Sequence, residues 1–328
     1  MITFKSQEST RHILNPRVES KPVFAPKIFV AGAENTLANV LTYGLYEQGA
    51  QISAQTVNHD SAIALKRNFP ILHCSLTDER FTHALATFSP DVILHAPAEP
   101  TRESSSHWPW AVFNRIVERT LAVCEAARRH SPTSHVVFLS SAEVYGECDS
   151  PAKEDRAPAP VTVQGRYTHI AEQVLRDFHE THGLKTTILR VSSAYGPSLR
   201  NNPVNDLLFN LIGPQGTNGK ADLNMNATCD LIHGADVVQA VRLILEKSTE
   251  GTFNVGSGTC LSLADLNTHL CAILELSPEP AYAKPTVTNT LAQRVDISKL
   301  KALGFVSQVP LLEGLRGYAA WWSGAKAA

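Results

Sequence analysis

Short apolar runs alternate with amphipathic segments along most of the chain. The apolar runs lie at 27–32, 51–57, 91–96, 135–141, 185–192 and 251–257. Segments with apolar residues at helical spacing lie between them, at 35–49, 60–68, 78–88, 110–130, 165–182 and 235–247. Strands separated by helices pair in parallel, and the helices then cover both faces of the sheet. The pattern therefore predicts an α/β fold, a doubly wound parallel sheet, with ligands bound beyond the carboxyl ends of the strands.

Composition narrows the functional classes. The chain has 328 residues, enough for one large α/β unit or two domains, with 43% hydrophobic and 18% charged residues and a formal net charge of −2. This balance argues against nucleic acid as a partner, and no apolar run approaches the roughly 18–20 residues that span a bilayer. Six cysteines without CxxC spacing indicate reduced thiols in a cytoplasmic protein. Residues 1–25 carry charges and prolines, which predicts a polar N-terminal arm and not a signal peptide.

Eight short motifs follow one another between residues 26 and 323. They are VAGAENTLANVL, DVILHAPA, FLSSAEVYGE, GRYTHIAEQVL, ILRVSSAYGP, CDLIHGADVVQAV, GTFNVGSGTCLSLADL and the closing VDISKLKALGF…LLEGLRGYAAWW. In this order they resemble the extended short-chain dehydrogenase/reductase family, the NAD-dependent nucleotide-sugar epimerases and dehydratases. The resemblance implies a Rossmann dinucleotide-binding domain at 26–195, to which 230–260 returns. It also implies a smaller C-terminal substrate-binding domain at 196–229 and 261–328.

The resemblance further implies partners. It points to a small-molecule substrate, to NAD or NADP as cofactor, and to a homodimer formed through helices near 110–130 and 165–182. Fold similarity alone does not transfer chemistry, so each functional position is compared separately.

The phosphate-binding loop departs from the family at one glycine. The three glycine positions read Gly32, Asn35 and Ala38. Asn35 places a side chain where the backbone would meet pyrophosphate. Asparagine tolerates a positive φ, which would preserve the turn while the cavity shrinks. The following helix still offers amide donors at Thr36 and Leu37, so dinucleotide binding is permitted but not required.

Two adenosine contacts of the family are also replaced. The acidic residue that ends the second strand and binds the adenosine ribose is Thr56 here, and the aspartate that contacts adenine is Ser75. No arginine follows that selects NADP. The other cofactor positions implied by the resemblance are Leu76, Ala96, Pro97, Ser140 and Val191.

The helix that carries the family's tyrosine and lysine lacks both. These positions are Gln164 and Thr168, while Gly165 and Glu172 keep the register. Gln164 exchanges no proton near neutral pH, and Thr168 carries no charge that would lower the pKa of a neighbouring phenol. Tyr167 lies near the same helix face. It is either a displaced catalytic tyrosine or a residue with a packing or solvent role.

The apolar run at 135–141 leads into a better preserved motif. In SSAEVYG, Ser141 matches the family's substrate-binding Ser/Thr, and Glu143 matches an acid of sugar dehydratases and decarboxylases. A carboxylate there can abstract or return a proton beside a carbonyl group. The alternative is that Glu143 is a hydrogen-bonded structural residue at a strand end.

Substrate positions are altered as well. Cys229 stands where the family often has a diphosphate-binding arginine, and Ser193 replaces the asparagine before YGP. Arg200 and Arg294 remain as candidate anion contacts, with surface ion pairs as the alternative. The clustered histidines at 169, 179 and 182 lack converging ligands, so no metal site is predicted.

Two functions remain open. One is a divergent epimerase/dehydratase-like enzyme that performs isomerase, lyase or dehydratase chemistry on a sugar-like molecule through Glu143 and Ser141, without the tyrosine–lysine relay. The other is a catalytically inactive binding or partner subunit that kept the fold.

Overall fold

A seven-stranded parallel sheet forms the centre of the molecule. The computed structural model describes residues 25–58, 68–97, 108–213, 223–277 and 294–324. The strand order is β3-β2-β1-β4-β5-β6-β9, and every neighbouring pair is parallel. The strands are β1 (Lys27–Ala31), β2 (Gln51–Thr56), β3 (Ile71–His73), β4 (Val92–His95), β5 (His135–Ser141), β6 (Thr186–Val191) and β9 (Gly251–Val255). The predicted doubly wound α/β fold is confirmed.

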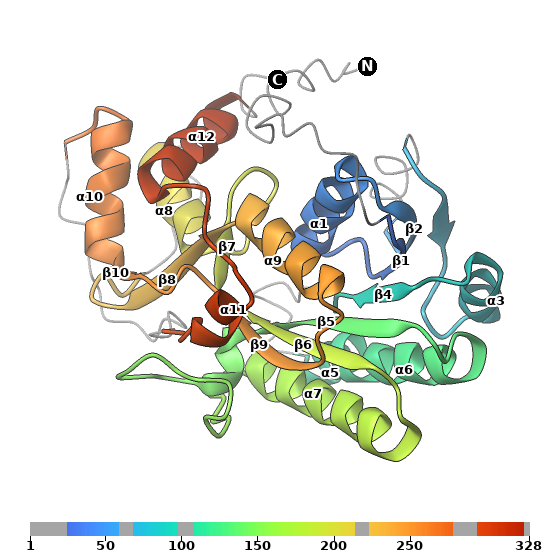
Figure 1. Ribbon diagram of the computed structural model, residues 1–328. Coiled ribbons are helices and arrows are strands. Elements are labelled where there is room, and N and C mark those ends of the chain that lie inside the picture. The colour runs from blue at the N-terminus through green and yellow to red at the C-terminus, as the bar shows by residue number, and fades with distance from the viewer. Residues whose placement is uncertain (1–24, 59–67, 98–107, 214–222, 278–293, 325–328) are drawn as a thin grey trace.

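Helices cover both faces of this sheet (Figure 1). One face packs on α1 (Thr36–Glu47) and α9 (Gly234–Glu246). The other packs on α3 (Glu79–Phe88), α5 (Pro109–Phe113), α6 (Arg119–His130) and α7 (Val163–His182), with the single π turn η1 (Asn114–Glu118) between α5 and α6. Ile28 and Val30 point into the first core, and Phe29 and Ala31 into the second. A strand buried on both faces needs a continuous apolar run, which explains the sequence KIFVA.

A smaller unit lies beyond the carboxyl ends of the last strands. Its three-stranded sheet has the order β10-β8-β7. Its elements are β7 (Ser193–Tyr195), β8 (Thr228–His233), β10 (Cys260–Ser262), α8 (Pro203–Ile212), α10 (Leu263–Ile273) and α12 (Leu311–Gly324). They enclose a third core around Leu208, Leu266 and Leu315. Residues 230–260 therefore supply α9 and β9 to the large unit and strands to the small one.

Several elements differ from the predicted ones. The strands β3, β7, β8 and β10 were not predicted. Three of them, β3, β7 and β10, have only three residues each, too few for an apolar run. The six residues of β8, TCDLIH, interrupt their apolar positions with Asp230 and His233. The helix predicted at 110–130 is divided by η1. The predicted helix at 60–68 falls almost wholly on 59–67, and the predicted arm on 1–24, both outside the described residues. Within the described ranges, no helix combines the length and apolar character needed to cross a bilayer.

Candidate functional site

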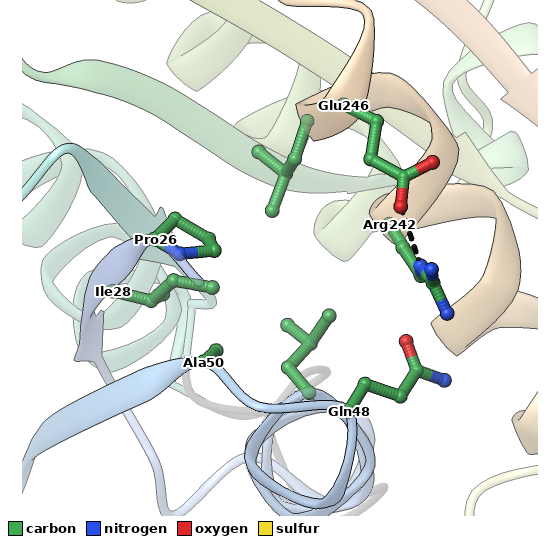
Figure 2. A pocket seen from close by; sticks show the side chains of 8 residues that line it. Pro26, Ile28, Gln48, Ala50, Arg242 and Glu246 are labelled. Carbon is green, nitrogen blue, oxygen red and sulfur yellow. Dashed lines mark hydrogen bonds and ion pairs between the residues drawn. The ribbon is translucent and has the colours of Figure 1, made fainter. Parts of the chain in front are cut away.

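The carboxyl ends of the strands, and not the hollow at the opposite edge, hold the candidate site. That hollow is small and lies between α1 and α9, at the amino end of β1 (Figure 2). It is lined by Pro26, Ile28, Leu45, Gln48, Ala50, Arg242, Leu245 and Glu246. None of the predicted site residues lines it.

The turn between β1 and α1 depends on Gly32. Its φ is +95°, and a Cβ atom there would lie 2.1 Å from the Ala96 carbonyl oxygen. Any side chain would therefore collide with the backbone after β4. Gly32 keeps the close approach of loop and strand that the sequence predicts, and Thr36 and Leu37 open α1 directly beyond it.

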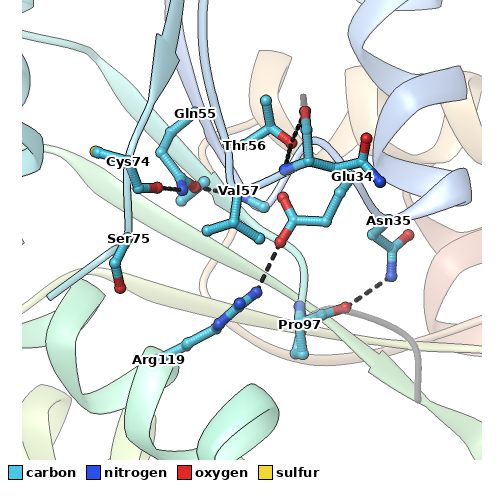
Figure 3. Close-up of polar contacts among 12 residues, drawn as sticks. Glu34, Asn35, Gln55, Thr56, Val57, Cys74, Ser75, Pro97 and Arg119 are labelled. Carbon is cyan, nitrogen blue, oxygen red and sulfur yellow. Dashed lines mark hydrogen bonds and ion pairs between the residues drawn. The ribbon is translucent and has the colours of Figure 1, made fainter. Parts of the chain in front are cut away.

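Asn35 does not take the predicted positive φ. Its φ is −64° and its ψ is 132°, because Asn35 is the N-cap of α1: its Oδ1 accepts the Ala38 amide at 3.0 Å. Its Nδ2 donates to the Pro97 carbonyl at 2.8 Å (Figure 3). The side chain thus joins the loop after β1 to the loop after β4. The expectation that Asn35 preserves a glycine-like turn is wrong, because capping favours extended backbone.

A buried glutamine ties the phosphate loop to β2. The Gln55 Oε1 atom accepts the Gly32 amide at 3.0 Å, and its Nε2 donates to the Cys74 carbonyl beyond β3. The Thr56 side chain is buried, and its hydroxyl accepts the Asn58 amide at 3.0 Å. The position predicted to bind ribose is therefore occupied by a hydroxyl engaged with its own loop.

Some of the remaining predicted cofactor-binding residues are buried in the core, and others are exposed. Ser75 is exposed and shares a 2.9 Å hydrogen bond with Thr77, whereas Leu76 is buried in the second core. Ala96 and Pro97 contribute the carbonyl groups that contact Gly32 and Asn35. The cofactor roles of these four residues stay predictions.

An acidic residue occupies the phosphate loop itself. Glu34 accepts a 2.7 Å hydrogen bond from Arg119, at the start of α6 (Figure 3). The Glu34 side chain is 10% exposed and the Arg119 side chain 17% exposed. The second carboxylate oxygen, Oε2, is buried and has no hydrogen-bond partner among the residues that the structure describes.

Glu143 lies between the end of β5 and the start of α7. Ser141 caps the short 3₁₀ turn η2 (Ala142–Tyr145) by accepting the Glu143 amide at 3.2 Å. The Thr162 hydroxyl donates to Glu143 Oε2 at 2.8 Å, and Thr162 also caps α7. Burial raises the pKa of Glu143, and the Thr162 hydrogen bond offsets part of that rise. A Cβ at Gly165 would lie 2.9 Å from the Glu143 carbonyl, so this glycine permits the close packing.

Three predicted catalytic residues lie on the first two turns of α7. Gln164 is partly buried in the first turn of α7, and Thr168 is buried. The Tyr167 ring packs edge-on against Phe113, with 5.7 Å between ring centroids. This contact supports the packing alternative for Tyr167, and the catalytic roles of Gln164, Tyr167 and Thr168 stay predictions.

Below Thr168, α7 is fixed to the sheet by a buried ion pair. Arg190 on β6 donates to both oxygens of Glu172, at 2.9 and 2.7 Å, and both side chains are at most 1% exposed. The Ser140 hydroxyl donates to Glu172 at 2.6 Å, so this predicted cofactor contact is engaged inside the network. Burial raises the pKa of Glu172, but the hydrogen bonds and charge of Arg190 outweigh it and lower the pKa overall. Val191 is the buried last residue of β6, in register with Ser141.

The four predicted substrate-binding residues differ in burial and in their hydrogen bonds. Cys229 is buried in the third core, where burial raises the pKa of its thiol to about 12, so it packs and presents no polar group. Ser193 is partly buried at the start of β7, and Arg200 is exposed. Arg294 donates to Thr228 Oγ1 at 3.4 Å and to the Asp149 carbonyl at 3.3 Å.

The sequence did not identify three residues of the site: Glu34, Gln55 and Thr162. The signal for Glu34 was an acid inside the phosphate-loop motif, and the signal for Gln55 was an amide inside a buried strand. Thr162 stands before the amphipathic segment as a typical N-cap. Among the described residues, no group of three or more histidine, cysteine or acidic side chains is placed to hold a metal ion.

Two curated proteins are similar to this chain in sequence, and a solved structure is similar to it in fold. The UDP-glucose 4-epimerase of Mycolicibacterium smegmatis is 26% identical over 75% of this chain and 80% of its own. The dTDP-D-glucose 4,6-dehydratase of Homo sapiens is 22% identical over 91% of this chain and 90% of its own. The crystal structure of Thermus thermophilus UDP-glucose 4-epimerase in complex with NAD superposes with a TM-score of 0.79 at 22% identity, covering 91% of this chain and 99% of that one.

The family assignment rests on a sequence match over most of the chain. The sequence profile of the NAD dependent epimerase/dehydratase family matches residues 28–256, which run from β1 to the end of the last strand of the large sheet. The match includes the phosphate loop, Glu143 and the altered α7. The chain belongs to the NAD dependent epimerase/dehydratase family.

Proposed function

We propose that this protein is an NAD-linked enzyme that acts on a nucleotide sugar or a related small molecule and uses Glu143 as its proton-transfer group. The names of its relatives, a UDP-glucose epimerase and a dTDP-glucose dehydratase, support the substrate class. The placement of Glu143 beside the N-terminus of α7 carries the proposal. The C-terminal domain that the resemblance implies, 196–229 with 261–328, would bind the substrate.

The residues around α1 fit a dinucleotide. Gly32 allows the loop to lie against the backbone after β4. The N-terminus of α1, at Thr36 and Leu37, would bind the pyrophosphate. When bound, the nicotinamide group supplies hydride transfer to and from a sugar carbon. The protein's own contribution is to bind and orient the substrate and to move a proton.

Glu143 has the properties of an acid/base. Thr162 fixes Oε2, while Oε1 has no hydrogen-bond partner among the described residues. Burial raises the pKa of the carboxyl group toward the range in which it can both accept and return a proton. Ser141 lies two residues away and can hydrogen-bond the same substrate oxygen. This pair would replace the tyrosine–lysine relay that Gln164 and Thr168 cannot provide, giving isomerase, lyase or dehydratase chemistry.

Dinucleotide binding tests the proposal first. The purified protein should bind NADH with a Kd below about 1 mM, because the α1 amides remain in place. Titration calorimetry or quenching of tryptophan fluorescence measures it. A folded protein that shows no binding at millimolar NADH would contradict the enzyme proposal.

One observation favours a second candidate, a binding or partner subunit without catalysis. The Asn35 side chain joins the phosphate loop to the Pro97 carbonyl, between the loops after β1 and β4 where a dinucleotide would bind. Absence of dinucleotide binding would support this candidate.

We further propose that the protein forms a homodimer through α6 and α7. Leu121 on α6 and Ile170 on α7 are 49% and 41% exposed, and the two helices pack side by side. Leu121→Asp with Ile170→Asp should convert a dimer to monomers, because a charge at each apolar contact must be desolvated. Sedimentation velocity measures the change. Val306→Asp, at an exposed apolar residue outside both helices, is the matched control; a wild-type monomer would refute the proposal.

A further inference from the structure

Glu34 offers an acceptor that nothing in the described structure uses. Arg119 holds Oε1 at 2.7 Å and so fixes the direction of the carboxylate. Oε2 is buried and has no hydrogen-bond partner within the described ranges of the chain. A buried carboxylate oxygen without a donor is costly, and a ligand hydroxyl that reached it would remove that cost.

This carboxylate lies beside the end of β2. The Ala33 amide donates to the Gln55 carbonyl at 2.8 Å, which holds the loop that carries Glu34 against that strand end. The strand end itself presents Thr56, whose hydroxyl is engaged with Asn58. Dinucleotide-binding folds place a carboxylate at this strand end to bind the adenosine ribose. Here the neighbouring loop, and not the strand, brings a carboxylate to the same strand end.

We propose that Glu34 accepts hydrogen bonds from the adenosine ribose hydroxyls and makes the site selective for NAD over NADP. The inference rests on the proposed function, since it requires that a dinucleotide binds. A carboxylate is a strong acceptor for a ribose diol, whereas the 2′-phosphate of NADP would bring two like charges together. Arg119 contributes by fixing the carboxylate and by balancing its charge.

Repulsion between the Glu34 carboxylate and the pyrophosphate predicts the opposite effect on NADH binding. If Glu34 mainly repels the pyrophosphate, its removal should tighten the binding of both dinucleotides equally. If Glu34 binds ribose, its removal should weaken NADH and leave NADPH unchanged or tighter. The two effects differ in sign for NADH.

The experiment compares NADH and NADPH binding to the wild type, Glu34→Gln and Glu47→Gln. Glu47 is an exposed glutamate at the C-terminal end of α1. Its exchange makes the same chemical change away from the phosphate loop. The wild type and Glu47→Gln should prefer NADH by about tenfold or more, which is the size of one charged hydrogen bond. Glu34→Gln should lose about tenfold in NADH affinity and most of the preference. Equal melting temperatures would show that the variants fold alike.

Each other outcome overturns the inference in a distinct way. A wild type that prefers NADPH overturns it without any variant. Unchanged or tighter NADH binding by Glu34→Gln overturns the ribose contact while leaving the proposed function intact. A wild type that binds neither dinucleotide overturns both.

Discussion

Glu143→Gln should lower kcat at least about a hundredfold on the nucleotide sugar that the wild type converts, because general acid–base catalysis contributes at least that factor. The exchange preserves size and the acceptor for the Thr162 hydroxyl but removes the transferable proton. KM should change little, since the amide can still hydrogen-bond the substrate. Steady-state kinetics with NAD present measures both constants.

The pH dependence of kcat/KM is a second test of the role of Glu143. Burial raises the pKa of Glu143. If the carboxylate acts as base, kcat/KM should rise with pH through a midpoint above that of an ordinary glutamate. This limb should disappear in Glu143→Gln.

Glu147→Gln is the matched control, because Glu147 is exposed four residues further along the same segment. It should retain wild-type kinetics. Full activity in Glu143→Gln would assign Glu143 the structural role and remove the proton-transfer proposal.

Arg190→Met should reduce the free energy of unfolding by about 3–5 kcal/mol, because it leaves the buried Glu172 carboxylate without its main partner. Arg190 also lies over the Tyr145 ring at 4.6 Å and donates to the Glu154 carbonyl at 3.2 Å, and these contacts would be lost together. Urea unfolding at neutral pH measures the difference. We expect the loss to loosen α7 and hence the position of Thr162 beside Glu143.

Arg242→Met provides the control for this change. Arg242 pairs with Glu246 at 2.7 Å on the surface of α9, where both side chains are more than a third exposed. Exposed pairs of this kind contribute about 0–1 kcal/mol, so this variant should unfold close to the wild type. Equal effects of the two exchanges would show that burial does not set the contribution of the Glu172–Arg190 pair.

The large sheet could be predicted because its strands are buried on both faces. Each such strand, KIFVA for example, needs an apolar run that is visible without any knowledge of its neighbours. The strands of the smaller unit lack this signal. β10 has three residues of intermediate burial, and its place depends on pairing with β8, 30 residues earlier at Cys260 and Asp230.

By itself, the sequence determined the α/β class, the register of α7 and the absence of a tyrosine and a lysine at Gln164 and Thr168. These are local properties, because periodicity and residue identity do not depend on distant contacts. Only the tertiary structure decided that Asn35 caps α1, that Tyr167 packs on Phe113, and that Cys229 is a core residue. It also joined Glu34 to Arg119, 85 residues apart. Such pairs form where loops from different strands meet at one sheet edge, and the chemistry of a site depends on which groups the fold brings within hydrogen-bond distance.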